Sequence, residues 1–143
     1  MAAASYADTS FLVSLCLRDA NSARAAEVAL RAMPVLLTPL LEHELRNAIR
    51  LCVFRGQISS AQREGVLYDF EQDKVAGVLH AVPMDWPKVL RHAEALSRRH
   101  TEALGVRGMD ILHVASALAL KAGRFVTFDE RQRTLAQLAG LNP

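Results

Sequence analysis

The stretch Phe125-Val126-Thr127-Phe128-Asp129 joins a short apolar strand pattern to a helical pattern, and an aspartate stands at the junction. Ser5-Tyr6-Ala7-Asp8, near the start of the chain, repeats this arrangement, with a strand pattern that ends in an aspartate before a helix. In a parallel α/β sheet all strands end at one edge, so side chains at the strand ends converge there. The two stretches therefore predict a parallel α/β sheet that carries Asp8 and Asp129 at the same edge.

The rest of the chain alternates short strand patterns with helical ones, and its length of 143 residues fits a single domain, 1–143. Strands are expected at 6–7, 35–37, 78–82 and 125–127. Expected helices cover 10–17, a segment capped by Asn21 or Ser22 and ended by Pro34, 39–55, 59–74, 86–103, 110–122 and 130–138. Thr38 before Pro39, and Ser59 with Gln62, are the expected helix starts of the third and fourth, and Gly56 and Gly123 are the expected stops after 55 and 122. Helices of this length between strands indicate right-handed parallel crossovers. We therefore predict a helix-rich α/β fold with four parallel strands.

Composition indicates a folded protein of the cytoplasm. The chain is 51% hydrophobic and 22% charged, which is not the composition of a disordered protein. Its start lacks the basic segment of a signal peptide, and the apolar run 111–120 is too short to span a bilayer. Cys16 and Cys52 stand apart in apolar helical stretches and form no zinc motif. The net charge of +2 is too small to identify a polyanionic partner, although 14 of the 17 basic residues are arginines.

Three aspartates, Asp8, Asp110 and Asp129, each precede a helical pattern, and aspartate is a favoured helix N-cap. Asp129 and Gln132 even have the spacing of a capping box. Taken singly, each aspartate fits this structural role better than a functional one. Taken together they favour a site, because Asp8 and Asp129 end strands at one sheet edge. Asp110 begins a helix that is apolar on almost every face, which places this residue near the core.

Glu44 adds a fourth carboxylate, inside a helical pattern rather than at its start. At about 100° per residue, Glu44 lies within an apolar stripe, on the same face as Leu41 and Ala48. An ionised carboxylate on a buried face is costly unless it is paired or bound to a metal. A salt bridge to a core arginine is the structural alternative for Glu44. Glu42, at the edge of the stripe, is its rival for a functional role.

Clustered carboxylates repel one another unless a cation lies among them, and their oxygens are ligands that Mg²⁺ prefers. The sequence therefore predicts a metal-dependent site formed by Asp8, Glu44, Asp110 and Asp129.

Other polar residues near this pattern fit structural roles at least as well. His113 lies one helical turn after Asp110, but no second histidine stands at ligand spacing, so we expect a core histidine with a hydrogen-bonded partner. Thr127, Thr9 and Ser10 are able to bond the site carboxylates or water, or to serve only in caps and turns.

Four segments of the chain resemble the signature segments of PIN-domain nucleases and, more narrowly, of the VapC toxins of bacterial type II toxin–antitoxin systems. They follow the expected order over nearly the whole chain: Tyr6-Ala7-Asp8-Thr9-Ser10-Phe11-Leu12, Glu44-Leu45-Arg46-Asn47-Ala48-Ile49, Asp110-Ile111-Leu112-His113-Val114-Ala115-Ser116-Ala117 and Val126-Thr127-Phe128-Asp129. The acidic positions of the family fall on the four carboxylates named above. The resemblance implies a three-layer α/β/α sandwich, a Mg²⁺- or Mn²⁺-dependent endoribonuclease, a cognate antitoxin and a homodimer.

A divalent metal suits phosphodiester hydrolysis because it lowers the pKa of bound water and acts as a Lewis acid. We expect Asp8 and Asp110 to be the primary ligands, with Glu44 and Asp129 completing the shell directly or through water. One of the latter two would orient the attacking water. Arginines are the candidates to hold flanking RNA phosphates, for instance Arg46, Arg50 or Arg107.

Three other classes of protein share part of this pattern. A phosphoryl-transfer enzyme with an aspartate nucleophile also ends its first strand in an aspartate, but the dehalogenase pattern needs a second aspartate where this chain has Ser10. A receiver domain needs a lysine after the last strand, where this chain has Phe128-Asp129. A PIN-like interaction module without catalysis has no reason to keep four costly carboxylates. An upstream reading frame for a small DNA-binding antitoxin would favour the toxin over all three.

Overall fold

The computed structural model describes residues 4–17, 22–32 and 34–143, and for residues 28–32 it describes the backbone alone. These residues form seven helices and four strands, which confirms the predicted helix-rich α/β class. Met1–Ala3 and Asn21, one of the two expected helix caps, lie outside the described residues. The chain divides into two compact units, one made of the residues up to Asp8 with Pro83–Pro143 and the other of Thr9–Val82. We call them the β1–β4 unit and the β2–β3 unit.

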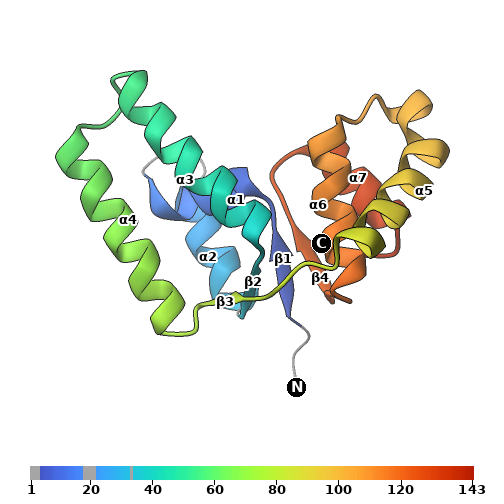
Figure 1. Cartoon of the computed structure of the whole chain (residues 1–143), viewed down its shortest axis with the longest axis horizontal. Helices are drawn as coiled ribbons and strands as arrows, with labels where there is room; N and C mark the ends of the chain where they lie inside the picture. The colour runs from blue at the N-terminus through green and yellow to red at the C-terminus, as the bar shows by residue number, and fades with distance from the viewer. Residues whose placement is uncertain (1–3, 18–21, 33) are drawn as a thin grey trace. The chain divides into compact units, whose positions relative to one another are not determined.

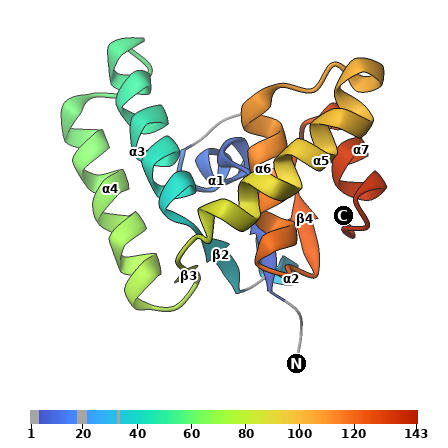
Figure 2. The same cartoon turned by 45° about the vertical axis from the view of Figure 1, so that its right-hand side comes forward.

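The β1–β4 unit is built on two parallel strands, β1 (Ser5–Ala7) and β4 (Arg124–Val126), with Tyr6 opposite Phe125. Its helices are α5 (Trp86–Leu104), α6 (Gly108–Ala119) and α7 (Glu130–Leu138). Helix α6 packs against both α5 and α7, and α7 also contacts β4 (Figure 2). Six residues of α6 are buried, so the prediction that this helix is central is confirmed.

The β2–β3 unit has the same local design, with β2 (Val35–Leu37) paired in parallel to β3 (Leu79–Ala81). Its helices are α1 (Thr9–Cys16), α2 (Ser22–Ala32), α3 (Pro39–Phe54) and α4 (Ser60–Val75). Helices α3 and α4 form a hairpin (Figure 1), and α1 contacts both α2 and α3. Both strand pairs are therefore parallel, as predicted.

Helix starts in the β2–β3 unit follow the expected capping chemistry. Thr38 is the N-cap of α3, its Oγ1 accepts a hydrogen bond from the Leu41 N–H over 3.1 Å, and Pro39 occupies the first turn. The helix ends before Gly56, whose φ of 72° lies in the left-handed region that glycine adopts without steric cost. The residues predicted to begin and end α3 therefore do so.

The end of α6 was predicted wrongly, at Ala122 with Gly123 as the stop. The helix ends at Ala119, because Lys121 adopts the left-handed conformation with a φ of 55°. The Lys121 N–H donates to the Leu118 carbonyl over 3.1 Å, and the Ala122 N–H donates to the Ala117 carbonyl over 2.9 Å. This pair of bonds is a Schellman motif, which satisfies the last carbonyls of the helix without a glycine.

The core of the β1–β4 unit contains a buried polar pair. His113 is 3% exposed, and its Nδ1 lies 2.8 Å from the hydroxyl of Tyr6, whose ring stacks on Phe125. The prediction of a core histidine with a hydrogen-bonded partner is therefore confirmed. Within the described residues, no helix combines the length and the apolar character needed to cross a membrane.

Candidate active site

Asp8 lies directly after β1 and is almost completely buried. Its N–H donates to the Val126 carbonyl over 3.1 Å, which extends the β1–β4 pairing by one residue and fixes the backbone. The residue is 4% exposed, and Oδ2 lies 3.0 Å from the hydroxyl of Thr127. A buried carboxylate requires such donors, because burial without hydrogen bonds is costly.

Asp129 is the N-cap of α7, as its sequence position predicted. Its Oδ1 accepts from the Gln132 N–H over 2.9 Å, and its own N–H donates to Thr127 Oγ1 over 3.0 Å. Thr127 therefore contacts both aspartates that follow the strands of this unit. The sequence left two roles open for Thr127, and the structure shows both: a hydrogen bond to the Asp8 carboxylate and one that accepts the Asp129 N–H at the helix start.

Asp110 lies in the first turn of α6 rather than at the helix cap, which corrects the sequence-based expectation. The helix starts at Gly108, and the N-cap residue Arg107 makes no capping bond with its side chain. A carboxylate in the first turn is favourable because it faces the positive end of the helix dipole. The side chain of Asp110 is 18% exposed, and its Oδ2 lies 3.0 Å from Arg107 Nε.

Asp110 and Asp129 line one cavity of about 410 Å³ in the β1–β4 unit. The cavity is also lined by the arginines Arg107 and Arg131, by a third carboxylate, Glu130, and by Gly105. The pKa of Arg107 is raised, first by its hydrogen bond to Asp110, then by the charge of Asp110, and to a smaller degree by the charge of Asp129. Both carboxylates therefore act electrostatically on the same guanidinium.

Glu44 belongs to the β2–β3 unit, where it lies in the middle of α3 between the buried residues Leu41 and Leu45. It is half-buried, and its Oε2 accepts a hydrogen bond from the Thr9 hydroxyl over 2.7 Å. Its convergence with the three aspartates stays a prediction. Glu42, the rival candidate, forms ion pairs instead: its Oε1 lies 2.7 Å from Arg46 Nη2 and 2.8 Å from Lys74 Nζ.

The donor set of the β1–β4 unit suits a hard divalent cation, because Asp8, Asp110 and Asp129 offer only carboxylate oxygens. Among the residues that the structure describes, no three His, Cys, Asp or Glu side chains are arranged to hold a metal ion together. Asp110 pairs instead with the guanidinium of Arg107.

Sequence reasoning missed two residues of this region, Gln132 and Arg131. Gln132 was considered only as the second half of a capping box, and its burial, with 1% of the residue exposed, could not be read from that spacing. Arg131 lines the cavity from the first turn of α7 and has no sequence signal beyond its charge. Of the three arginines proposed for RNA, Arg107 lines the cavity and Arg46 is engaged in ion pairs.

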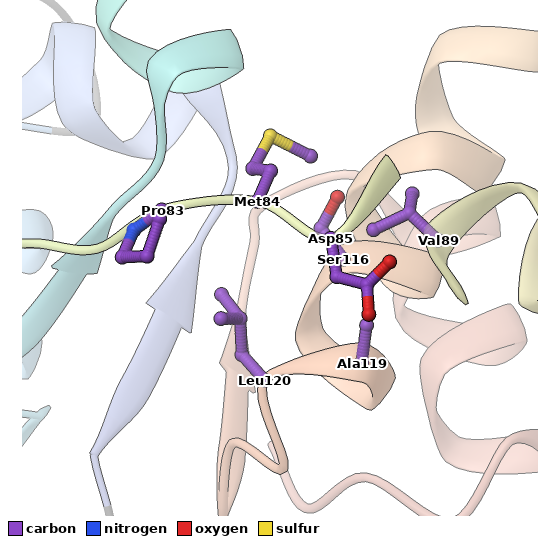
Figure 3. A pocket seen from close by; sticks show the side chains of 7 residues that line it. All are labelled: Pro83, Met84, Asp85, Val89, Ser116, Ala119 and Leu120. Carbon is purple, nitrogen blue, oxygen red and sulfur yellow. The ribbon is translucent and has the colours of Figure 1, made fainter. Parts of the chain in front are cut away.

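Two other cavities carry less chemistry. One in the β1–β4 unit has a volume of about 320 Å³ and is mainly apolar; its lining is Pro83, Met84, Asp85, Val89, Ser116, Ala119 and Leu120 (Figure 3). One in the β2–β3 unit, of about 710 Å³, is lined in part by both cysteines. Burial, followed by the charges of Asp73 and Asp69, raises the pKa of the Cys16 thiol to about 12, so this thiol is a weak nucleophile.

Comparisons with known proteins agree with this architecture. The chain has the fold of FitAcB from Neisseria gonorrhoeae, with 16% identity, a TM-score of 0.67, and 93% of each chain covered. It also has the fold of Mycobacterium tuberculosis VapC20, described as a sarcin–ricin loop cleaving toxin, with 16% identity, a TM-score of 0.67, and 92% of this chain and 94% of that chain covered. No curated protein sequence matches the chain. The profile of the PIN domain family matches residues 5–138. The chain therefore belongs to the PIN domain family.

Proposed function

We propose that this protein is a metal-dependent endoribonuclease that acts as the toxin of a toxin–antitoxin pair. The observation that carries the proposal is the arrangement in the β1–β4 unit, where Asp110 and Asp129 line one cavity and Thr127 joins Asp8 to Asp129. Membership of the PIN domain family and the fold shared with VapC20, a toxin that cleaves the sarcin–ricin loop, support the same class of activity.

Asp8 and Asp110 would be the primary ligands of Mg²⁺ or Mn²⁺, and Asp129 and Glu44 would complete the shell. The metal, when bound, lowers the pKa of water and offsets the negative charge that develops on the phosphodiester. Asp129 or Glu44 would hold the attacking water in line with the phosphorus atom and accept a proton from it. Asp110 would bind the metal only after Arg107 moves away from it. Breaking this ion pair costs little free energy, because exposed ion pairs contribute little to stability.

Arg107 and Arg131 would hold the RNA, since both line the cavity that carries Asp110 and Asp129. A guanidinium binds phosphate oxygens through two parallel hydrogen bonds, so these side chains would fix the phosphates beside the scissile bond. Cleavage would leave a 5′-phosphate and a 3′-hydroxyl. The proposed partners are a cognate antitoxin and a second copy of the chain, and the proposed location is the cytoplasm.

An RNA-cleavage assay on the purified chain tests this function. We expect cleavage at internal phosphodiesters with Mg²⁺ or Mn²⁺, its loss on addition of EDTA, and its return with excess metal. Expression without a partner should arrest growth. Cleavage that persists in EDTA would contradict the metal requirement, and an inactive, harmless wild-type chain would contradict the nuclease function.

A further inference from the structure

Gln132 occupies the third helical position of α7, where a glutamine can complete a capping box. The chain has a complete box at α4: the Ser59 N–H donates to Gln62 Oε1 over 2.7 Å, and the Gln62 N–H donates to Ser59 Oγ over 3.0 Å. At α7 the Gln132 N–H donates to Asp129 Oδ1, but the Asp129 N–H donates to Thr127 Oγ1 instead of to Gln132. The Gln132 side chain therefore does something other than close the box.

The Gln132 side chain is buried and links two elements of the β1–β4 unit. Its Oε1 lies 2.9 Å from Thr127 Oγ1, and its Nε2 lies 3.4 Å from the carbonyl oxygen of Asp110. A buried amide without such partners is destabilising, so the side chain is confined to a position that satisfies both ends. Gln132 thus connects the end of β4 to the first turn of α6.

Thr127 transmits the position of Gln132 to Asp8. Its hydroxyl lies 2.9 Å from Gln132 Oε1 and 3.0 Å from Asp8 Oδ2, and it accepts the Asp129 N–H over 3.0 Å. A hydroxyl has one proton, so Thr127 donates to Gln132 or to Asp8, but not to both at once. Gln132 therefore affects the position of the Thr127 hydroxyl and whether this hydroxyl donates a hydrogen bond to Asp8.

We propose that Gln132 is a positioning residue of the active site, whose single buried amide links the segments that carry Asp8, Asp110 and Asp129 and thereby supports the binding of a divalent cation. Its side chain reaches Asp8 and Asp129 through Thr127, which contacts both, and it reaches Asp110 through the backbone carbonyl of that residue. Groups that orient metal ligands in this way typically change metal affinity by about 10- to 100-fold when they are removed. The role rests on the metal-dependent function proposed above.

The test is the affinity of the full chain for Mn²⁺, measured by calorimetry without RNA. Gln132→Met keeps the length of the side chain and removes its hydrogen bonds, and we expect it to weaken Mn²⁺ binding by about 10- to 100-fold. Gln62→Met is the matched control, because Gln62 has the same place in an exposed capping box and should change the affinity by less than about twofold. If Gln132→Met does not fold, Gln132→Asn, which keeps an amide but is shorter, should show the same loss.

Two further variants distinguish a positioning role of Gln132 from a contribution to stability alone. Leu135→Ala removes a buried apolar side chain from the same helix, so it should lower the melting temperature and leave Mn²⁺ affinity unchanged. In a Thr127→Val background, Gln132→Met should weaken Mn²⁺ binding less than it does in the wild type, because the link to Asp8 is already broken.

An Mn²⁺ affinity that is unchanged by both Gln132→Met and Gln132→Asn would overturn the inference, as would an equal loss in both backgrounds. A wild-type chain that binds no Mn²⁺ would instead contradict the metal-dependent function, and this role with it.

Discussion

Two groups of acidic residues in this chain differ in what neutralises them. In the β2–β3 unit, Glu42 and Glu71 lie between Arg46 and Lys74, and both cations contact both carboxylates. The cations also lie over the buried ring of Phe70, at 5.6 and 5.7 Å from its centroid. This group contains its own counter-charges and joins α3 to α4.

The aspartates of the β1–β4 unit are held differently. The Thr127 hydroxyl lies within hydrogen-bond distance of the Asp8 carboxylate, and the Gln132 N–H donates to Asp129; both of these donors are neutral. Asp110 pairs with Arg107, whose side chain is 78% exposed and easily displaced. The first group is paired with cations of the same unit, whereas in the second Asp110 pairs with one exposed arginine at a cavity that Asp129 also lines. The difference teaches that the partners of a carboxylate, more than its burial, distinguish a structural acid from a candidate catalytic one.

The largest expected difference between the groups is in catalysis. Asp110→Ala removes a proposed ligand, so RNA cleavage should fall by about 1000-fold or more, since charge stabilisation and nucleophile activation are each worth several kcal/mol. Glu71→Ala removes a carboxylate of the structural group and should change the rate by less than about threefold. Initial rates at saturating Mn²⁺, with circular dichroism to confirm folding, make the comparison. Comparable losses in the two variants would erase the distinction.

Arg107→Ala should separate substrate binding from metal binding. Loss of a charge-assisted phosphate contact should raise the KM for RNA about tenfold. Release of Asp110 should leave Mn²⁺ affinity equal to or higher than that of the wild type. Arg98→Ala, which removes another exposed arginine of the same unit, should affect neither quantity. A weaker affinity for Mn²⁺ in Arg107→Ala would mean that the ion pair supports the site rather than competing for it.

Asp8→Asn tests whether the second group is under electrostatic strain. Without metal, its melting temperature should be no lower than that of the wild type, because like charges are removed while an oxygen remains for Thr127. At 100 times its dissociation constant, Mn²⁺ should stabilise the wild type by about 2.7 kcal/mol, and the variant by much less. Thermal unfolding with and without Mn²⁺ measures both effects. An unchanged Mn²⁺ shift in Asp8→Asn would count against Asp8 as a ligand.

The smallest effect is expected in the structural group. The pKa of Lys74 is raised above its usual 10.5, first by its hydrogen bond to Glu42. A lysine whose pKa is raised on folding contributes stability in full below pH 10.5, and this contribution is lost as the pH rises through the folded-state pKa. Lys74→Met should therefore cost about 1 kcal/mol or less at neutral pH, as expected for a partly exposed pair. Urea unfolding near pH 11 should show a smaller difference; a constant difference would contradict this account.

Sequence reasoning was strongest where a residue acts on its own neighbours in the chain. The caps at Thr38, Ser59 and Asp129 are local chemistry, and each was predicted from spacing. The end of α6 was missed because a left-handed Lys121 is less common than a glycine stop. The bonds of Gln132 were missed for a different reason: spacing cannot show that the Asp129 N–H donates to Thr127, or that the Gln132 amide lies against the Asp110 carbonyl.

The four proposed site residues were found through a sequence resemblance and through strand-end placement, which is a property of fold topology. Physical patterns alone located Asp8 and Asp129, because both follow strands that the apolar periodicity reveals. They predicted that α6 starts at Asp110, two residues after its actual start at Gly108, because the helix start lacks a capping side chain. Partners such as Arg107 for Asp110 depend on side-chain geometry, which periodicity does not encode.

The position of Mn²⁺ in crystals of the wild-type chain, located by its anomalous scattering, is the most direct test of the difference between the two acidic groups. We predict a peak bounded by the carboxylates of Asp8, Asp110 and Asp129, with Arg107 moved away from Asp110. An ion bound at Glu42 and Glu71, or no ion at the three aspartates at saturating Mn²⁺, would contradict the account.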